Sequence, residues 1–268
     1  MVRLSNFSRW GYRSLVLAAI CFVAGPAIAA DRVSTRVEIY GVLGLHVLTL
    51  HTVLDEAADR YTLTMDYATT GVAGLVIDET NHAQAIGRLT AVSADPASFR
   101  SNARRNGGEI RKSVDYRPDG IVEGSSTPAP PTPIAPAAAR GTVDNLTAYF
   151  RLQRQLAAKK TCALTVPVFD GRYRYDLVFS DVGVQKLPPE RGQAFDGDAI
   201  GCRMTRRLRD NPDPEEVEGA QQGIIWYAAL LPGDVVVPVR MQLDTQIGSV
   251  DGLLAEVHGR GVDLLLIK

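Results

Sequence analysis

The stretch from Cys162 to Phe179, CALTVPVFDGRYRYDLVF, decides the fold because it holds two strand-like patterns separated by a turn. Its second half alternates apolar and charged side chains, the period of two that a half-buried β-strand requires. One face would carry Tyr173, Tyr175, Leu177 and Phe179. The opposite face would carry Arg172, Arg174 and Asp176. We therefore expect a strand that buries its tyrosine-bearing face.

The dipeptide Asp170-Gly171 predicts a turn between the two halves, because tight turns need residues that adopt positive φ. A strict two-residue hairpin would place Pro167 opposite Arg174 in a hydrogen-bonded pair, and proline has no N–H to donate. Either the turn is longer, or the incoming strand pairs only near residues 168–169.

Three further stretches repeat the alternation, with turn residues between them. Their apolar positions are Tyr61, Leu63, Met65 and Tyr67, then Ile110, Val114 and Tyr116, then Val237, Val239, Met241 and Leu243. In the last stretch Pro238, Arg240 and Gln242 are expected on the polar face, toward water or a wet cavity. The predicted fold class is mainly β: an antiparallel barrel or half-open barrel, made by a curved sheet, with one main helix packed against it.

Residues 142–160 form the one segment with a clear helical pattern. Thr142 or Asp144 is suited to the N-cap, and Lys159 and Lys160 suit the C-terminal end. A buried stripe is predicted at Leu146, Tyr149, Phe150 and Leu156. We expect this helix to plug or cover one side of the sheet.

The first 29 residues have the form of a cleavable signal peptide. Their basic start carries Arg3, Arg9 and Arg13. An apolar run follows at 14–25, then the small residues of a cleavage site at 27–29. The apolar run is shorter than the roughly 20 residues of a membrane-spanning helix. We expect residues 30–268 to form a single β-rich domain in the periplasm, with peripheral membrane contact at most.

Loss of the signal peptide would remove Cys21 and leave two cysteines, Cys162 and Cys202. An even number of cysteines in an oxidising compartment favours a disulfide. Closing a loop of this length would stabilise the fold by about 4 kcal/mol. The alternative is a thiol nucleophile assisted by a histidine. No cysteine-hydrolase signature surrounds the four histidines, which are His46, His51, His82 and His258.

Two segments are predicted to be irregular. Residues 124–139 hold five prolines and favour an extended linker or loop, with a proline-rich recognition segment as the less favoured alternative. Residues 203–219 are basic first and acidic after, and Pro212 and Pro214 favour a solvated loop. The alternative there is an anion-binding site made by Arg206, Arg207 and Arg209. Neighbouring acids would weaken the field of such a site.

Neither charge nor motifs indicate nucleic acid, a cofactor or a catalytic centre. Of 29 basic residues three belong to the signal peptide, which leaves 26 against 30 acidic residues and no basic bias. The sequence has no P-loop, dinucleotide fingerprint, G-x-S-x-G elbow or H-E-x-x-H helix. We assign no catalytic, cofactor or ligand-binding residues and favour a non-enzymatic protein.

Two pairs of polar residues suggest chemistry, and both have simpler explanations. His46 and His51 are five positions apart, so in one strand they project to opposite faces and would not share a metal. Asp170 and Asp176 flank the tyrosine-rich strand, where a turn and cross-strand ion pairs account for them. No metal site is expected.

Several stretches together resemble a family of exported proteobacterial proteins catalogued as domain of unknown function 3108. They include YGVLGLHV, SFRSNARRNGGEIRKSVDY, IIWYAAL and VPVRMQLDTQIGSVDGLL. The resemblance covers residues 33–254. It is most specific in the order of Cys162, the Phe169–Arg172 turn and Cys202. It implies a similar length and an export signal, and it offers no catalytic residues.

Three functions fit these observations. The preferred one is a non-catalytic periplasmic β-scaffold that binds an apolar or amphipathic ligand, such as a lipid, or an envelope component; it predicts a large apolar cavity. The alternative is a cell-envelope assembly or integrity factor that acts through protein contacts and exposes an apolar patch or sheet edge. The third is a hydrolase with a dispersed site, for example Asp176 with a histidine, in a polar cleft.

Overall fold

The structure is a computed structural model. It describes residues 31–267, except positions 72, 73, 75, 76, 91, 92, 211–218, 234, 246 and 247. The expected signal peptide and the two prolines of the charged segment lie outside the described residues.

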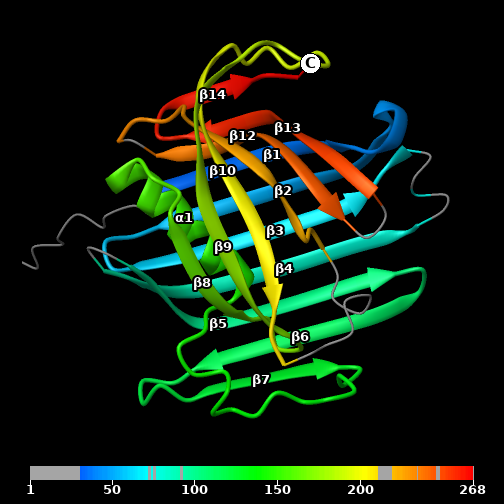
Figure 1. Cartoon of the computed structure of the whole chain (residues 1–268), viewed down its shortest axis with the longest axis vertical. Helices are drawn as coiled ribbons and strands as arrows, with labels where there is room; N and C mark the ends of the chain where they lie inside the picture. The colour runs from blue at the N-terminus through cyan, green and yellow to red at the C-terminus, as the bar shows by residue number, and fades with distance from the viewer. Residues whose placement is uncertain are drawn as a thin grey trace, which may run out of the picture.

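One antiparallel sheet forms a nearly closed barrel of thirteen strands, which confirms the predicted fold class (Figure 1). A fourteenth strand pairs with the thirteenth outside this path. The strands are β1 (Asp31–Tyr40), β2 (His46–Glu56), β3 (Arg60–Thr69), β4 (Glu79–Leu89), β5 (Ala94–Arg105), β6 (Gly108–Tyr116), β7 (Val122–Thr127), β8 (Leu164–Phe169), β9 (Arg174–Leu187), β10 (Gly197–Leu208), β11 (Gln222–Ala229), β12 (Val236–Thr245), β13 (Gly248–Gly259) and β14 (Val262–Leu265). A short 3₁₀ helix, η1 (Val42–Gly44), connects β1 to β2.

The strand order is β7-β6-β5-β4-β3-β2-β1-β13-β12-β11-β10-β9-β8. Each half of the chain therefore forms a meander, and the two meanders join where β1 pairs with β13. That register runs from Val33 opposite Gly259 to Tyr40 opposite Asp251. Figure 1 shows β8–β10 crossing in front of β2–β5, with the helix beside β8.

The helix α1 (Asn145–Lys159) joins two apolar clusters inside the barrel. Asp144 is its N-cap and accepts a hydrogen bond from the backbone N–H of Thr147, so the second of the two predicted caps is the one used. The predicted stripe is buried at Leu146, Phe150 and Leu156 and half-buried at Tyr149. Leu146 and Phe150 pack with the β3–β7 side, whereas Ala148, Leu152 and Leu156 pack with the β8–β13 side. No described helix is long and apolar enough to cross a bilayer.

The predicted faces of the strands agree with the structure at most positions. Tyr173, Tyr175, Leu177 and Phe179 are all buried, so the register expected for β9 is correct. Tyr61 and Leu63 on β3, Val114 on β6, and Val237, Val239 and Met241 on β12 are buried as well. The remaining predicted inward positions are half-buried: Met65, Tyr67, Ile110, Tyr116 and Leu243.

The expectation that Arg240 contacts water is wrong. Its side chain is buried because the connection between β9 and β10 folds over this part of β12. The guanidinium donates to the carbonyl of Pro188 (2.8 Å) and forms an ion pair with Glu190 (3.0 Å). In the same connection, the Gln193 amide donates to the carbonyls of Val239 (2.8 Å) and Leu254 (3.0 Å).

The two segments predicted to be irregular differ in outcome. The loop expected at 203–219 is wrong for residues 203–208, which belong to β10. All six residues pair with β9, and residues 203–205 also pair with β11 on the other side. Strand pairing on both sides outweighs the local run of charge. In the segment 124–139, residues 124–127 belong to β7, and the rest forms turns and irregular chain up to the buried Ala139.

Candidate functional site

A four-residue turn links β8 to β9, because Phe169 and Arg174 are paired across it. Of the two alternatives left open by the sequence, this is the longer turn. The Asp170 carboxylate accepts hydrogen bonds from the backbone N–H groups of Arg172 (2.9 Å) and Tyr173 (2.7 Å). An aspartate that bonds to the backbone ahead of it stabilises the turn in place of a backbone bond.

This turn lies directly on β6 and β7. Gly171 has φ +92°, and a Cβ there would be 2.8 Å from the carbonyl oxygen of Ser113 and 2.9 Å from that of Ser125. A Cβ on Gly124 would collide with the ring of Phe169. Both positions therefore require glycine, because the turn and the strands approach too closely for a side chain. The turn lies where a β7–β8 pair would otherwise close the barrel.

Polar side chains hold the turn in this position. The Lys112 ammonium on β6 forms an ion pair with Asp170 (2.7 Å), and both side chains are largely buried. The Arg172 guanidinium donates to the carbonyl of Pro128 (2.7 Å) and the hydroxyl of Ser126 (3.3 Å). Burial raises the pKa of Asp170, but Lys112 and the two turn N–H groups outweigh it and hold the pKa below its usual value.

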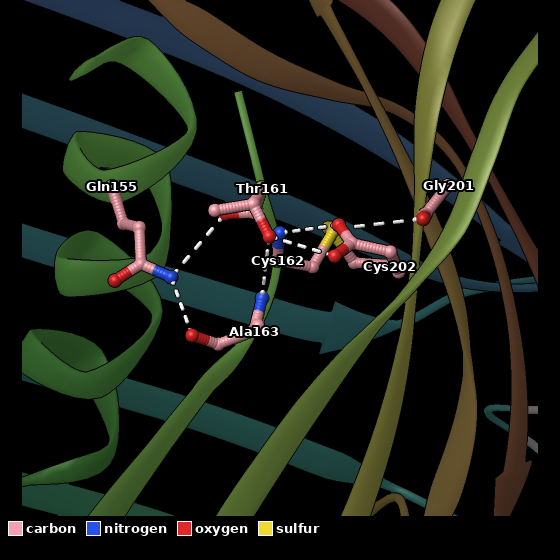
Figure 2. Close-up of a disulfide and its surroundings, with 7 residues drawn as sticks. Gln155, Thr161, Cys162, Ala163, Gly201 and Cys202 are labelled. Atoms are coloured by element: carbon pink, nitrogen blue, oxygen red, sulfur yellow. Dashed lines mark hydrogen bonds between the residues drawn. A yellow bond between two sulfur atoms is a disulfide. The ribbon is translucent and has the colours of Figure 1, made fainter. Parts of the chain in front are cut away.

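A disulfide joins Cys162, just before β8, to Cys202 on β10, with a Cα–Cα distance of 5.5 Å (Figure 2). Both cysteines are fully buried. The Asp181 carboxylate on β9, between them, accepts from the Cys162 backbone N–H (2.6 Å) and the Thr161 hydroxyl (2.7 Å). This is the pairing predicted from the cysteine count, and its surroundings are those of a structural link.

The helix is tied to the same region. Figure 2 shows the Gln155 side chain reaching from α1 toward the disulfide-bearing segment. Its amide nitrogen donates to the carbonyls of Ala163 (2.8 Å) and Thr161 (3.3 Å). The C-terminal half of α1 is thus fixed relative to β8, and this half forms one wall of a cavity.

The cavity lies between α1 and the inner faces of β1–β3 and β11–β12, and has a volume of about 700 Å³. Its walls are mainly apolar and include Leu50, Leu54, Leu63, Phe150, Tyr227 and Met241. Leu50 and Leu54 face inward yet remain half-buried, because they border this space. The sequence produces it by placing short side chains around it, among them Thr35, Thr52, Ala157 and Ala158.

Three charged side chains line one part of the cavity: Glu56 from the end of β2, Arg154 from α1 and Arg260 from the β13–β14 turn. Arg260 pairs with Glu56 (2.9 Å), and Arg154 lies farther from the same carboxylate (3.7 Å). These three residues are called the charged rim below. The charged rim was not predicted from the sequence, because nothing in the local pattern relates three residues that lie in such distant segments.

The histidines and the proposed catalytic aspartate do not meet in the cavity. His46 contacts Glu38 (2.6 Å), His258 contacts Asp263 (2.7 Å), and Asp176 pairs with Arg209. Within the described residues, no group of three or more His, Cys, Asp or Glu side chains is arranged to hold a metal ion.

One histidine–carboxylate pair does lie in a polar hollow. His82 contacts Asp66 (2.6 Å) in a groove of about 690 Å³ that His51 also lines. The His82 and Asp66 side chains are 60% and 53% exposed, so water surrounds the pair. Such a groove lacks the water exclusion that strengthens electrostatic catalysis. Asp176, the residue suggested for a dispersed hydrolase site, is not part of it.

These features define a β-barrel-like protein with an internal helix and an apolar interior. The chain belongs to the family described as "Protein of unknown function (DUF3108)", which matches residues 34–255. Its fold is similar to that of a solved structure, a β-barrel-like protein of domain of unknown function DUF1849 from Brucella abortus. That similarity has a TM-score of 0.51 and 12% identity, and covers 86% of this chain and 98% of the other. A comparison with curated proteins gives no match.

Proposed function

We propose that this protein is a non-catalytic periplasmic binding protein that holds an apolar or amphipathic ligand inside its barrel. The observation that carries the proposal is the apolar cavity of about 700 Å³ between α1 and the sheet. Small-molecule sites are typically cavities of about 300–1,000 Å³ with mostly apolar walls and a few polar groups. The cavity and its charged rim have this composition.

Two observations support the periplasm as the compartment. The buried Cys162–Cys202 disulfide is of the kind that persists where the environment is oxidising. The first 29 residues have the composition of a cleavable signal peptide. Fractionation of cells expressing the full chain, followed by N-terminal sequencing of the purified protein, tests both: a periplasmic protein starting at Ala30 is expected.

The first experiment on function is native mass spectrometry of protein purified from the periplasm, followed by denaturing lipid extraction. We expect an adduct that leaves on denaturation and appears in the organic extract as an apolar molecule. An empty protein that also fails to bind an added apolar fluorophore would overturn the proposal.

A matched pair of variants locates the binding. Thr52 lines the cavity, whereas Val53 follows it on β2 and projects to the outer face. Thr52→Phe should place an aromatic ring in the cavity and weaken fluorophore binding at least tenfold, the size of effect expected when an apolar group can no longer be buried. Val53→Phe adds an aromatic ring to the same strand and should leave binding unchanged. Equal binding by both variants would place the ligand elsewhere.

A second candidate, an envelope assembly factor acting through protein contacts, is favoured by one observation. Among the described residues, β8 pairs with β9 only from Arg174 to Phe179, so β9 beyond that point has one unpaired edge. Val182 and Val184 on this part are 45% and 69% exposed. Unpaired edges are sites where another chain can add a strand. Cross-linking from a photoreactive residue at position 184 in living cells tests this: a defined protein adduct would favour it.

A further inference from the structure

The charged rim makes one part of the cavity polar, while the rest of its lining is apolar. Glu56, Arg154 and Arg260 have side chains that are 16%, 29% and 20% exposed, so all three are partly withdrawn from water. The rest of the lining is mainly apolar. Two guanidinium groups and the Glu56 carboxylate lie beside an apolar space, and a second carboxylate, Asp31, pairs with Arg260 outside the lining. Electrostatic interactions are stronger in such a setting than in water.

Arg260 is already engaged by two carboxylates of the protein. It forms ion pairs with Asp31 (2.5 Å) and Glu56 (2.9 Å), and it donates a third bond to the carbonyl of Pro232 (3.2 Å). Its charge is matched by these two carboxylates, so it has little attraction left for a ligand.

Arg154 is not engaged to the same extent. Its guanidinium makes one hydrogen bond, to the carbonyl of Thr90 (2.9 Å), and lies over the ring of Phe150 at 5.8 Å. Glu56 is 3.7 Å away, beyond hydrogen-bond distance, and the Arg154 Nε is buried without a partner. A guanidinium has five N–H donors that match a planar or tetrahedral oxyanion. Arg154 therefore has N–H donors that the protein does not use, and its ion pair with Glu56 is a long one.

We propose that the ligand is an amphiphile with a negatively charged head, a carboxylate or a phosphate, which binds Arg154 while its apolar tail occupies the cavity. This inference rests on the proposed function of the same cavity. The reason is complementarity: an anionic head accepts from the remaining donors of Arg154, whose nearest carboxylate, Glu56, is 3.7 Å away and already paired with Arg260. A neutral head forms weaker hydrogen bonds with a guanidinium than an anionic head does, and a cationic head cannot accept from it.

The test compares heads on one tail. Dodecanoate, dodecyl phosphate, dodecanol and dodecyltrimethylammonium are used, below their micelle concentrations, to displace an apolar fluorophore from the purified protein. We expect the two anions to bind roughly tenfold or more tightly than dodecanol, since hydrogen bonds to charged groups are among the stronger ones. The ammonium compound should bind most weakly. The ratio of the affinities for dodecanoate and dodecyl phosphate distinguishes a carboxylate from a phosphate ligand.

Variants assign the preference to Arg154. Arg154→Gln should bring the anions to the affinity of dodecanol, leave dodecanol binding unchanged, and retain the folded circular dichroism spectrum. Arg154→Lys should restore part of the preference for anions. The control is Lys159→Gln, which removes the same charge from the exposed end of α1 outside the cavity lining and should change nothing.

Three results would contradict the inference. Equal binding of all four compounds to the native protein would remove the preference for an anionic head but leave the cavity as the binding site. An equal loss for every head in Arg154→Gln would give Arg154 a structural role only. Binding of none of the four would overturn the proposed function itself, and the inference with it.

Discussion

Lys112 on β6 and Asp170 in the β8–β9 turn form a largely buried ion pair of 2.7 Å that connects the two ends of the thirteen-strand path. The path ends at β7 and β8, which are not neighbours in the sheet order. Most barrels close with a ladder of backbone bonds. Here β7 and β8 are held by side chains and by the fit of one turn, and the free edge of β8 makes two backbone bonds with Val143. Single substitutions at this contact should reveal its contribution.

Replacing Lys112 by methionine should lower the free energy of unfolding by about 3 kcal/mol at pH 7, because it leaves a buried carboxylate without its cation. Urea denaturation with the disulfide intact measures the change. Arg111→Met is the control: Arg111 pairs with Glu109 on the same strand, but both side chains are exposed, so the cost should stay below about 1 kcal/mol.

The same pair gives a pH dependence with a definite sign. Because the pKa of Asp170 is lowered on folding, the stability it contributes is present above its ordinary value of 3.8. That contribution is lost as the pH falls through the lower, folded-state pKa. The stability difference between native protein and Lys112→Met should therefore shrink at acidic pH. A difference that does not change with pH would mean that Asp170 is not charged in the fold.

Gly171→Ala should be strongly destabilising, by roughly 3 kcal/mol, since the added Cβ meets two strand carbonyls as well as an unfavourable φ. Gly141→Ala is the matched control, because Gly141 also has a positive φ (+75°) but nothing within 4 Å of its Cβ. Gly141→Ala should lower the free energy of unfolding by about 1 kcal/mol, which is the cost of placing alanine at a positive φ without a steric clash. Equal losses in thermal or urea denaturation would show that the turn does not press against β6 and β7.

Removing the disulfide with Cys162→Ser and Cys202→Ser together should lower the free energy of unfolding by about 4 kcal/mol, because the unfolded chain regains the conformational entropy that the closed loop had removed. The barrel should remain folded and retain its cavity. In the native oxidised protein, a thiol reagent under denaturing, non-reducing conditions should find no free cysteine. Two reactive thiols in that assay would disprove the link.

Asp144→Asn should change the pH profile of stability in the opposite sense to Lys112→Met. Burial raises the Asp144 pKa from 3.8 to about 6, against the lowering effect of its bonds to Thr147. The folded protein therefore holds this proton more tightly, and stability falls as the pH rises from about 4 to about 6.

Asparagine still caps the helix but does not titrate. Relative to the native protein, the variant should gain about 2 kcal/mol between pH 4 and pH 7, because part of the effect of the roughly two-unit shift lies below pH 4. Other acids titrate alike in both proteins and cancel in the comparison. Urea denaturation at pH 4, 5, 6 and 7 measures the gain. Parallel pH profiles for the two proteins would show that folding does not raise the pKa of Asp144.

Much of the fold was predictable, because its signals are local. Alternation of apolar and polar residues located the buried face of β9, and the N-cap, apolar stripe and lysines located α1. The two cysteines left after the expected signal peptide pointed to the disulfide. Each of these features is determined by neighbours in the sequence or by a count.

The remaining features depend on contacts between distant segments. Arg240 occupies a position that alternation assigns to water, and only the fold of residues 188–196 over β12 buries it. The charged run at 203–219 and its two prolines suggested a loop, but β9 and β11 pair with the first part of that run. The charged rim combines Glu56 and Arg260, whose side chains meet across 204 positions of sequence.

The pairing of β1 with β13 also determines the order in which the barrel can assemble. A chain made from its N-terminus has β1 available early, but the partner for its second edge is not synthesised until residues 251–259 emerge. Contacts between such distant residues make folding slow, and an open strand edge can bind other chains in the meantime. Until β13 pairs with it, β1 of a growing chain therefore carries an open edge that favours aggregation.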